Sequence, residues 1–330
     1  MTAPLLDVRD LQVELKAGHG VVHAVRGASF AVAPGEALGL VGESGSGKTM
    51  ALRAIVGLLP RVGSVTGGSI ALDGEDLTQL GPKRLRELRG RAMSMVFQEP
   101  MTALNPVMRV GEQIAETPRQ RLGRSKAQAY DRALELMRLV GIPDPVRRAR
   151  AYPHELSGGL RQRVMIAIAL SGDPRVILCD EPTTALDVTI QDQILKLLSG
   201  LREELGVALV FVSHDLAVIA QTCQKVAVMY GGMVVETGAV ADVFREPRHP
   251  YTLSLLRSVP DYEQIRDRLS TIPGAPPDLV HPPAGCPFAQ EDCKDGDFPL
   301  RALSADRATA CIHPDACEAD VAREPVIVNA

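Results

Sequence analysis

Apolar residues recur along this chain at two spacings, and the dominant spacing changes from segment to segment. Alternating apolar and polar residues predict strands over 6–15 and 28–32, and an unbroken apolar run predicts a buried strand over 37–41. The segment after the next Gly-rich loop, 48–59, has a helical pattern. Short apolar runs predict four more strands: 69–72, 93–97, 176–179 and 207–212. Strands and helices that alternate in this way predict an α/β fold.

A helical region interrupts the strand pattern. Residues 108–142 are rich in Arg, Glu, Gln and Ala and have no strand signal, which predicts a helical subdomain of about residues 100–172 inserted into the α/β core. Another helix with one apolar stripe is predicted between the last two strands, and Gly206 ends it. The stripe consists of Ile190, Ile194, Leu197, Leu198, Leu201 and Leu205. Residues 225–236 predict a hairpin that turns at Gly231-Gly232.

Proline marks a change in composition near the end of the alternating pattern. Twelve of the 24 prolines lie between Pro247 and Pro325, where the strand and helix signals largely stop. We therefore predict a first domain over residues 1–245 and an extension over residues 246–330.

Charge and hydropathy exclude several classes of protein. The formal net charge is −4, so the chain lacks the basic balance of a nucleic-acid-binding protein. The chain contains no run of 18 or more apolar residues, so we predict no membrane-spanning segment. The first residues lack the basic start and apolar centre of a signal peptide. We expect a soluble, cytoplasmic chain whose membrane role comes through partners.

Residues 42–49 read Gly-Glu-Ser-Gly-Ser-Gly-Lys-Thr and match the pattern G-x-x-x-x-G-K-[ST] between a predicted strand and helix. Glycines let backbone N–H groups surround a phosphate, and the following helix adds its positive end. Lys48 is predicted to reach the β and γ phosphates, and Thr49 to bind Mg²⁺. The loop alone predicts a nucleotide binder, a property that kinases and GTPases share. The expected ATP contacts are Gly42, Glu43, Ser44, Gly45, Ser46, Gly47, Lys48, Thr49 and Met50.

Two adjacent carboxylates follow the predicted strand at 176–179. Asp180 suits a Mg²⁺ ligand, and Glu181 suits a general base that activates water. An apolar strand that simply ends in solvated acids is common, so the pair by itself leaves a structural interpretation open. Cys179 lies within the apolar run and is interpreted as a core residue.

Residues 156–163, Leu-Ser-Gly-Gly-Leu-Arg-Gln-Arg, resemble the signature of ATP-binding-cassette (ABC) ATPases. An ordinary helix start with Ser157 as N-cap is the structural alternative. In the family this helix end faces the γ-phosphate held by a second subunit. The resemblance therefore implies contacts in trans from Ser157, Gly158, Gly159 and Leu160. Many family members have Gln at position 160, but the peptide-importer branch tolerates an apolar residue there, so Leu160 is not interpreted as inactivating.

Further residues resemble motifs of this family and occur along the chain in the same order as in the family. Gln98 resembles the loop glutamine that touches Mg²⁺ and water and contacts the membrane partner. Ala185-Leu186-Asp187 resembles the loop that crosses the dimer interface, and His214 resembles the switch histidine at the γ-phosphate. His19 stands where the family usually places an aromatic residue under the adenine. The resemblance implies a Mg²⁺ site of Thr49, Gln98 and Asp180, and catalysis by Glu181, His214 and Gln98.

The resemblance covers about residues 5–240 and implies a P-loop ABC cassette. That fold has a RecA-like core, an antiparallel β subdomain and a helical subdomain. The working unit of the family has two cassettes, with each ATP between the phosphate loop of one and the signature of the other. Because the cassette occurs once in this chain, we expect ATP hydrolysis to require a dimer.

The extension has its own resemblance. His249-Pro250-Tyr251-Thr252, residues 272–277 and residues 285–288 resemble the C-terminal extension of the oligopeptide/dipeptide/nickel importer ATPases. The chain most resembles the D-type subunit of that branch. This implies a heterodimer with a homologous F-type ATPase, two transmembrane permease subunits and an extracytoplasmic substrate-binding protein. The expected place is the cytoplasmic face of the cell membrane.

Four of the six cysteines have the spacing C-x6-C-x17-C-x5-C. The spacing leaves zinc, an iron–sulfur cluster and structural thiols open. Members of the importer branch with four such cysteines look like [4Fe-4S] carriers, so the resemblance implies a cluster that stabilises a proline-rich segment. Zn²⁺ is the alternative, with His281 or His313 as substitute ligands. The four cysteines are Cys286, Cys293, Cys311 and Cys317.

The expected function is an ATPase that drives the import of oligopeptides or dipeptides. Nickel, glutathione-like compounds and oligosaccharides stay open as cargo, because other subunits select it. A soluble ABC protein that acts on nucleic acid or ribosomes is disfavoured by the single cassette and the acidic charge. A metal or redox sensor with secondary ATPase activity is a third hypothesis, motivated by the cysteines.

Overall fold

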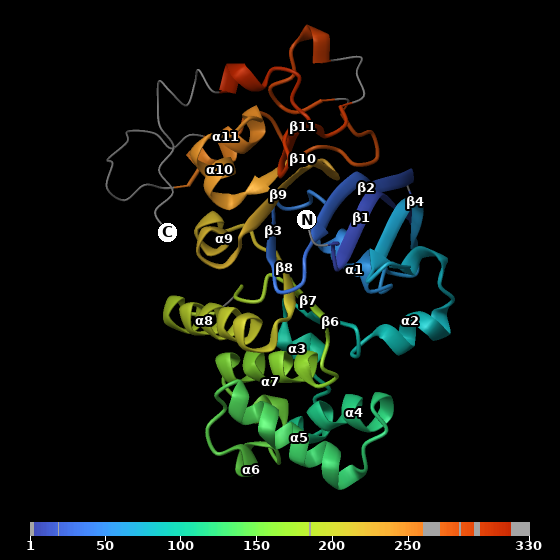
Figure 1. The fold of residues 1–330 in the computed structure, drawn as a ribbon, viewed down its shortest axis with the longest axis vertical. Helices are drawn as coiled ribbons and strands as arrows, with labels where there is room; N and C mark the ends of the chain where they lie inside the picture. Colours follow the sequence, from blue (N-terminus) through green and yellow to red (C-terminus); the bar gives the residue numbers. More distant parts are fainter. Residues whose placement is uncertain are drawn as a thin grey trace. The chain divides into compact units, whose positions relative to one another are not determined.

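The computed structural model describes residues 3–18, 20–184, 186–259, 271–283, 285–293 and 298–317. The chain forms two compact units (Figure 1). The first unit contains Met1–Leu5, Ala33–Glu36 and Gln79–Val210, and the second contains Leu6–Val32, Ala37–Thr78 and Phe211–Ala330. Strand β8 (Ala208–Val212) passes from the first unit to the second. Among the described residues, no helix has the length and apolar character to span a membrane.

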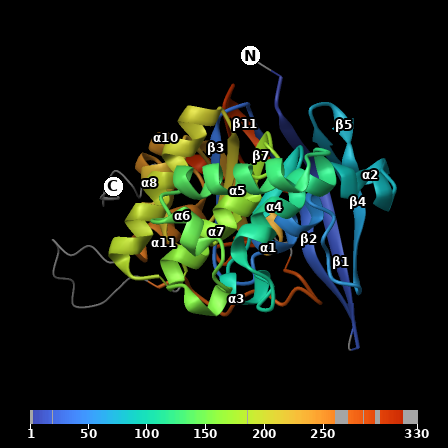
Figure 2. The same cartoon turned by 90° about the horizontal axis from the view of Figure 1, so that it is seen from below.

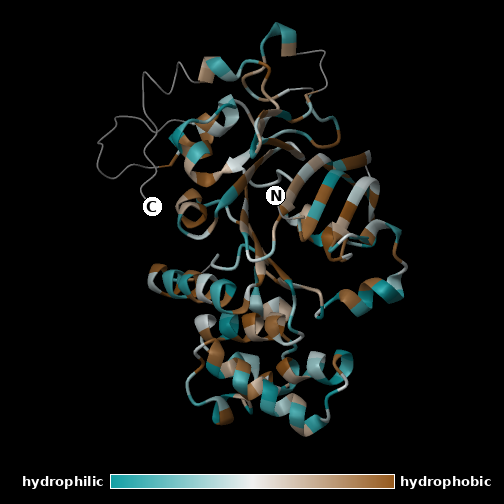
Figure 3. Ribbon diagram, in the orientation of Figure 1, coloured by the Kyte–Doolittle hydropathy of each residue, from teal (hydrophilic) through white to brown (hydrophobic). Residues whose placement is uncertain are grey.

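An antiparallel sheet of four strands belongs to the second unit, in the order β2-β1-β4-β5. Strand β1 (Leu6–Ala17) pairs with β2 (Gly20–Val32) on one side and with β4 (Gly63–Leu72) on the other, and β5 (Glu75–Asp76) pairs with β4. Apolar and polar residues alternate along β1, β2 and β4 (Figure 3), as expected of strands with one buried face. This confirms the predicted antiparallel subdomain.

The second unit also contains strands in the order β11-β12-β10-β9-β3. Strand β3 (Ala37–Val41) is buried throughout and lies parallel to β9 (Lys225–Tyr230). A turn with positive φ at both glycines, Gly231 and Gly232, joins β9 to β10 (Met233–Ala239), so the predicted hairpin is confirmed. The helices of this unit are α1 (Lys48–Ile55), α9 (Leu216–Thr222), α10 (Val240–Arg245) and α11 (Pro250–Arg257).

In the first unit, β6 (Met93–Val96) and β7 (Val176–Asp180) lie parallel, with Val96 opposite Cys179. The chain between them is helical, which confirms the predicted subdomain. Helices α4, α5 and α7 of that subdomain pack on one another (Figure 2). The helices of this unit are α2 (Pro82–Leu88), α3 (Pro100–Ala103), α4 (Val110–Arg121), α5 (Lys126–Leu139), α6 (Pro145–Arg148), α7 (Gly158–Leu170) and α8 (Val188–Leu205).

Several predicted boundaries are wrong. Helix α1 ends at Ile55 instead of residue 59, because Gly57 is left-handed and the Leu58 N–H donates to the Arg53 carbonyl at 2.8 Å, which closes the helix. In α8, Leu205 is 48% exposed, and Leu195 is buried in the apolar face instead. The strands predicted at 28–32 and 69–72 begin earlier, at Gly20 and Gly63, because both pair with β1 along almost its full length, with Gly20 opposite Ala17 and Gly63 opposite Leu15. The short helices α2 and α9 have too few turns to show a period, and the sequence did not predict them.

The extension joins the second unit through strand pairing and a buried ion pair. Strand β12 (Arg307–Thr309) pairs with β11 (Arg301–Ser304) and with β10, where Thr309 lies opposite Glu236. Arg307 Nη2 lies 3.0 Å from Glu236 Oε1, and the Glu236 side chain is fully buried. Burial raises the pKa of Glu236, and its hydrogen bonds to the Arg248 N–H and to Arg307 oppose that shift. The contacts group residues 211–330 with residues 6–32 and 37–78. This grouping does not test the predicted domain limit at residue 245, which stays a prediction.

Replacing Arg307 with alanine should lower the free energy of unfolding by about 3–5 kcal/mol, because the Glu236 carboxylate would stay buried without its cation. Urea denaturation of the full chain measures this. Arg301→Ala is the matched control, since Arg301 is exposed on the neighbouring strand and should change the free energy by less than about 0.5 kcal/mol. Equal effects of the two variants would contradict a stabilising role of the ion pair.

Candidate functional site

The phosphate loop connects the buried strand β3 to α1 in the second unit. Gly42 has φ 147°, and a Cβ atom there would lie 2.1 Å from the Met229 carbonyl oxygen. Gly47 has φ 100°, and its Cβ would lie 2.3 Å from the Ala24 carbonyl oxygen. Both positions therefore require glycine for conformation and for space. The close approach of β9 and β2 to the loop explains two of the three glycines in the motif.

Lys48 begins α1 and folds back over the loop. Its Nζ donates to the carbonyl oxygens of Gly42 and Glu43, both at 2.7 Å, and to Ser46 Oγ at 3.1 Å. The Lys48 side chain is buried, whereas Ser44 and Gly45 at the tip of the loop are exposed. A buried ammonium group surrounded by oxygen dipoles, with exposed backbone N–H groups close by in the chain, suits a site for anionic phosphate.

Neighbouring elements fix the shape of this loop. The Gly232 N–H, in the β9–β10 turn, donates to the Ser46 carbonyl at 3.1 Å. The Glu43 N–H donates to the hydroxyl oxygen of Tyr251, at the start of α11, at 3.1 Å. Thr49 and Met50 are half-buried at the beginning of α1. The nine loop residues predicted from the motif thus form one continuous loop and helix start.

His214 lies in the same unit, directly after β8. The preceding residue, Ser213, donates its N–H to the Leu40 carbonyl at 3.3 Å, close to the end of β3. The next residue, Asp215, caps α9 by accepting from the Ala217 N–H at 2.9 Å. The His214 side chain is exposed between these two anchored residues. The backbone on both sides of His214 is therefore fixed at the end of β8.

The predicted catalytic carboxylates lie in the first unit, at the end of β7, which is parallel to β6. Asp180 is the last residue of β7 and is buried, and Glu181 follows it. Gln98 comes two residues after β6. Gln98 Nε2 donates to Glu181 Oε2 at 2.9 Å, and Thr184 Oγ1 donates to the same oxygen at 2.8 Å. Two of the predicted catalytic residues are therefore in direct contact, and Thr184 is a partner that the sequence did not indicate.

Glu181 has a strained backbone. Its φ is 46°, in the left-handed region that residues with a side chain rarely adopt. Such strain costs roughly 1–3 kcal/mol and is found at functional sites when the surroundings over-determine it. Here the hydrogen bonds from Gln98 and Thr184 hold the carboxylate in one orientation. The strained turn re-directs the chain immediately after the buried strand.

The signature residues form the exposed start of α7 in the first unit. Ser157 occupies the N-cap position, but its side chain makes no cap hydrogen bond. The structural alternative of a simple serine cap is therefore not supported. Ser157 and Gly158 are exposed, and a Cβ at Gly159 would lie 2.8 Å from Ile190 Cγ2 of α8. Leu160 is half-buried in the first turn. The helix start thus presents a hydroxyl and backbone N–H groups outward.

The other predicted residues have mixed outcomes. Asp187 is exposed at the N-cap position of α8 without a side-chain cap hydrogen bond. Ala185 and His19 lie outside the described residues. The roles assigned to Gln98, Asp180, Glu181 and His214 in the nucleotide site stay predictions.

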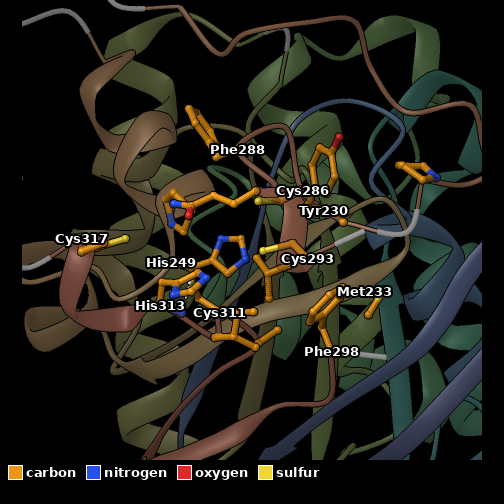
Figure 4. Close-up of a pocket in the computed structure, with 18 of the residues that line it drawn as sticks. Tyr230, Met233, His249, Cys286, Phe288, Cys293, Phe298, Cys311, His313 and Cys317 are labelled. Atoms are coloured by element: carbon orange, nitrogen blue, oxygen red, sulfur yellow. Dashed lines mark hydrogen bonds between the residues drawn. The ribbon is translucent and has the colours of Figure 1, made fainter. Parts of the chain in front are cut away.

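All four clustered cysteines line one pocket of about 330 Å³ in the second unit (Figure 4). They come from two described stretches of the extension, 285–293 and 298–317. Cys317 is buried, and Cys286, Cys293 and Cys311 are half-buried. Aromatic and histidine side chains also line the pocket, among them Tyr230, His249, Phe288, Phe298 and His313 (Figure 4). The fold therefore brings together thiols that are up to 31 positions apart in the sequence.

The thiols in this pocket influence one another. Burial raises the pKa of Cys286, and the negative charges of Cys311 and Cys293 raise it further. A hydrogen bond from Cys317 lowers the pKa of Cys311 to about 7. The His313 N–H also donates to Cys311 Sγ at 3.4 Å. Burial and the neighbouring charges therefore favour the thiol form of Cys286, whereas hydrogen bonding favours the thiolate form of Cys311.

A second group of possible ligands overlaps the cysteines. Ligand atoms of Asp292, Cys293 and His313 lie within 4.8 Å of one another, and His313 Nε2 is 2.9 Å from Asp292 Oδ2. His313 agrees with the substitute zinc ligand named from the sequence, whereas Asp292 was not predicted. His281 forms an exposed pair with Asp278 and is not among the residues that line the pocket. Among the described residues, Asp292, Cys293 and His313 are therefore the group whose spacing suits a shared metal ion.

Two family matches cover most of the chain. Residues 25–184 match the family described as ABC transporter, and residues 235–295 match the family described as oligopeptide/dipeptide transporter, C-terminal region. The first match includes the phosphate loop, the signature and both carboxylates. The second includes the start of α11 and two of the four cysteines. Both resemblances inferred from short motifs are thus confirmed over long segments.

Individual proteins agree with these matches. The oligopeptide transport ATP-binding protein OppD of Bacillus subtilis is 49% identical, covering 86% of this chain and 80% of that protein. OppD of Salmonella typhimurium is 46% identical, covering 94% of each. The structure of a dimeric ATP-binding cassette bound to ADP and Pi superposes with a TM-score of 0.64 at 30% identity, covering 71% of this chain and 98% of that one. The chain therefore belongs to the family of ABC transporter ATP-binding proteins, and it is an ATPase of that family with the C-terminal region of the oligopeptide/dipeptide transporters.

Proposed function

We propose that this chain is the ATP-hydrolysing subunit of an importer for oligopeptides or dipeptides. The observation that carries the proposal is that one chain combines the complete cassette with the extension of the oligopeptide/dipeptide transporters. Relatives that are 46–49% identical over most of their length are named oligopeptide transport ATP-binding proteins. Nickel, glutathione-like compounds and oligosaccharides are alternative cargo for the same machinery.

The proposed assembly has four kinds of subunit. This chain, as the D-type subunit, pairs with a homologous F-type ATPase, and the pair works on two transmembrane permease subunits at the cytoplasmic face of the membrane. An extracytoplasmic protein delivers the cargo. The dimeric cassette with bound ADP and Pi supports pairing as a property of close structural relatives. The exposed start of α7, with its uncapped Ser157, supports a role for the signature in trans.

In the proposed reaction, Lys48 and the loop N–H groups bind the β and γ phosphates, and Thr49, Asp180 and Gln98 hold Mg²⁺. Glu181 orients the attacking water and accepts its proton, and His214 contacts the γ-phosphate. The hydrogen bonds from Gln98 and Thr184 to Glu181 Oε2 support this role, because they fix the direction of the carboxylate. Movement of Gln98 with the nucleotide would pass the change to the permease subunits.

Replacing Glu181 with glutamine should lower the ATPase rate of the assembled importer by at least about 100-fold, because the amide cannot accept the proton of water. ATP binding should persist, and the variant should trap ATP in the closed dimer. Steady-state phosphate release and nucleotide retention on the purified complex measure the two effects.

Glu204→Gln is the matched control for this experiment. It makes the same chemical change on the exposed surface of α8 and should keep the wild-type rate. An unchanged ATPase rate in Glu181→Gln would contradict the role of Glu181 as general base.

We propose further that Cys286, Cys293, Cys311 and Cys317 hold a [4Fe-4S] cluster with a structural role. The shared pocket and the interacting thiols support a thiolate-bound centre. Bound at this place, the cluster would supply a cross-link between residues 285–293 and residues 298–317 of the proline-rich extension. Zn²⁺ is the alternative, with His313 as a possible ligand.

Anaerobic purification with the partner subunits should yield about four iron atoms and a similar amount of acid-labile sulfide per chain. Cys286→Ser and Cys293→Ser should each remove most of the iron, whereas Cys223→Ser should retain it, because Cys223 lies beside Thr222 in α9 and not among the pocket residues. Metal analysis and the visible absorption spectrum are the readouts.

The outcomes separate the alternatives. Stoichiometric zinc without sulfide would replace the cluster with a zinc site. Transport that follows the ambient redox potential reversibly would contradict the structural role and favour the sensor hypothesis. Retention of iron in all the cysteine variants would place the metal elsewhere.

A further inference from the structure

The segment His249-Pro250-Tyr251 of the extension reaches the phosphate loop. Tyr251 is fully buried at the start of α11, and its hydroxyl oxygen accepts the Glu43 N–H at 3.1 Å. The two residues are 208 positions apart in the sequence. The nucleotide loop is therefore held in part by the C-terminal extension.

The place of this hydrogen bond within the loop gives it a specific effect. The carbonyl of Gly42 and the N–H of Glu43 are the two polar groups of one rigid peptide plane. Lys48 Nζ donates to that carbonyl at 2.7 Å, while Tyr251 receives the N–H on the other side. Rotation of the plane would break both hydrogen bonds. The Tyr251 hydroxyl thus holds the carbonyl group that positions the Lys48 ammonium.

Several contacts fix Tyr251 itself. His249 Nδ1 accepts the Tyr251 N–H at 3.2 Å, and Pro250 occupies the first position of α11, where its fixed φ favours the helix start. The Tyr251 ring packs against Tyr230, with centroids 4.7 Å apart and planes at 52°. Burial raises the pKa of Tyr251 above its usual range, and the Glu43 carboxylate raises it further, so the phenol keeps its proton at neutral pH. A neutral, immobilised hydroxyl is suited to orient a peptide group.

We propose that Tyr251 is a positioning residue of the nucleotide site, which acts through the Gly42–Glu43 peptide on Lys48. The proposal rests on the proposed role of this loop in binding ATP. A phenylalanine ring would fill the same space against Tyr230, so packing alone does not require the hydroxyl. The hydroxyl is required by the Glu43 N–H, which would otherwise lose its partner at the edge of the loop.

Nucleotide binding to the full-length chain tests the proposal. Tyr251→Phe should raise the Kd for fluorescent MgATP by about five- to tenfold, because it leaves the Glu43 N–H unpaired and frees the peptide plane. Since the effect passes through Lys48, which serves the β and γ phosphates, the Kd for AMP in competition should stay at the wild-type value. A general loss of packing would weaken both nucleotides equally and would overturn the proposal.

Tyr230→Phe is the matched control. It removes the hydroxyl of the neighbouring ring in the same aromatic pair, but the Glu43 N–H donates to Tyr251 and not to Tyr230. Its Kd for MgATP should equal the wild-type value, because the hydrogen bond of the Glu43 N–H stays intact. A wild-type Kd in Tyr251→Phe, or an equal rise in both variants, would overturn the proposal.

Hydrogen exchange of the nucleotide-free wild type gives a second test that needs no variant. The Glu43 amide should exchange much more slowly than the amides of the exposed residues Ser44 and Gly45. In Tyr251→Phe the Glu43 amide should lose this protection while amides of β9 keep theirs. Fast exchange at Glu43 in the wild type would overturn the proposal. If wild-type chain failed to bind MgATP, the proposed function would fail, and the exchange rates would still decide whether Tyr251 holds the loop.

Discussion

Lys48 is buried, and a buried ammonium group is costly unless dipoles or negative charges surround it. The carbonyl oxygens of Gly42 and Glu43 and the hydroxyl of Ser46 meet that need, but only if the loop curls so that these groups point inward. The curl brings Gly42 against the carbonyl of Met229, where only glycine fits. The need to surround one cation therefore dictates the shape of the loop and the residue type at its start, and brings β9 into contact with it.

The contacts that hold the phosphate loop also link the extension to the cassette. The turn between β9 and β10 supports the loop through the Gly232 N–H, and β10 also pairs with β12 of the extension. Tyr230 at the end of β9 lines the four-cysteine pocket and packs against Tyr251, which contacts the loop. The cysteine pocket and the phosphate loop thus share their supporting strands. Residues 211–330 consequently belong to the same compact unit as the loop and the antiparallel sheet.

The carboxylates that are predicted to act in catalysis, Asp180 and Glu181, lie in the first unit. Parallel strands end at a common edge, so β6 and β7 deliver Gln98 and Glu181 to the same place. The left-handed backbone of Glu181 stores strain that the hydrogen bonds from Gln98 and Thr184 help to maintain. The contact between Gln98 and Glu181 depends on how β6 and β7 pair, whereas the phosphate loop depends on the backbone conformation of neighbouring residues. The phosphate loop and the two acids, which are more than 130 residues apart, are therefore positioned by different structural features.

Local chemistry is what the sequence by itself determined here. The phosphate loop, the two acids at the end of β7, the hairpin at Gly231-Gly232 and the helical subdomain each depend on neighbouring residues, and their patterns predicted them. The resemblance of the extension also indicated that the four cysteines belong together, and the fold places them in one pocket. The tertiary structure alone decided two contacts between distant residues: the hydrogen bond from Glu43 to Tyr251 and the ion pair of Glu236 with Arg307. No spacing rule encodes these contacts, because they depend on strand order and on which elements pack together after the chain has folded.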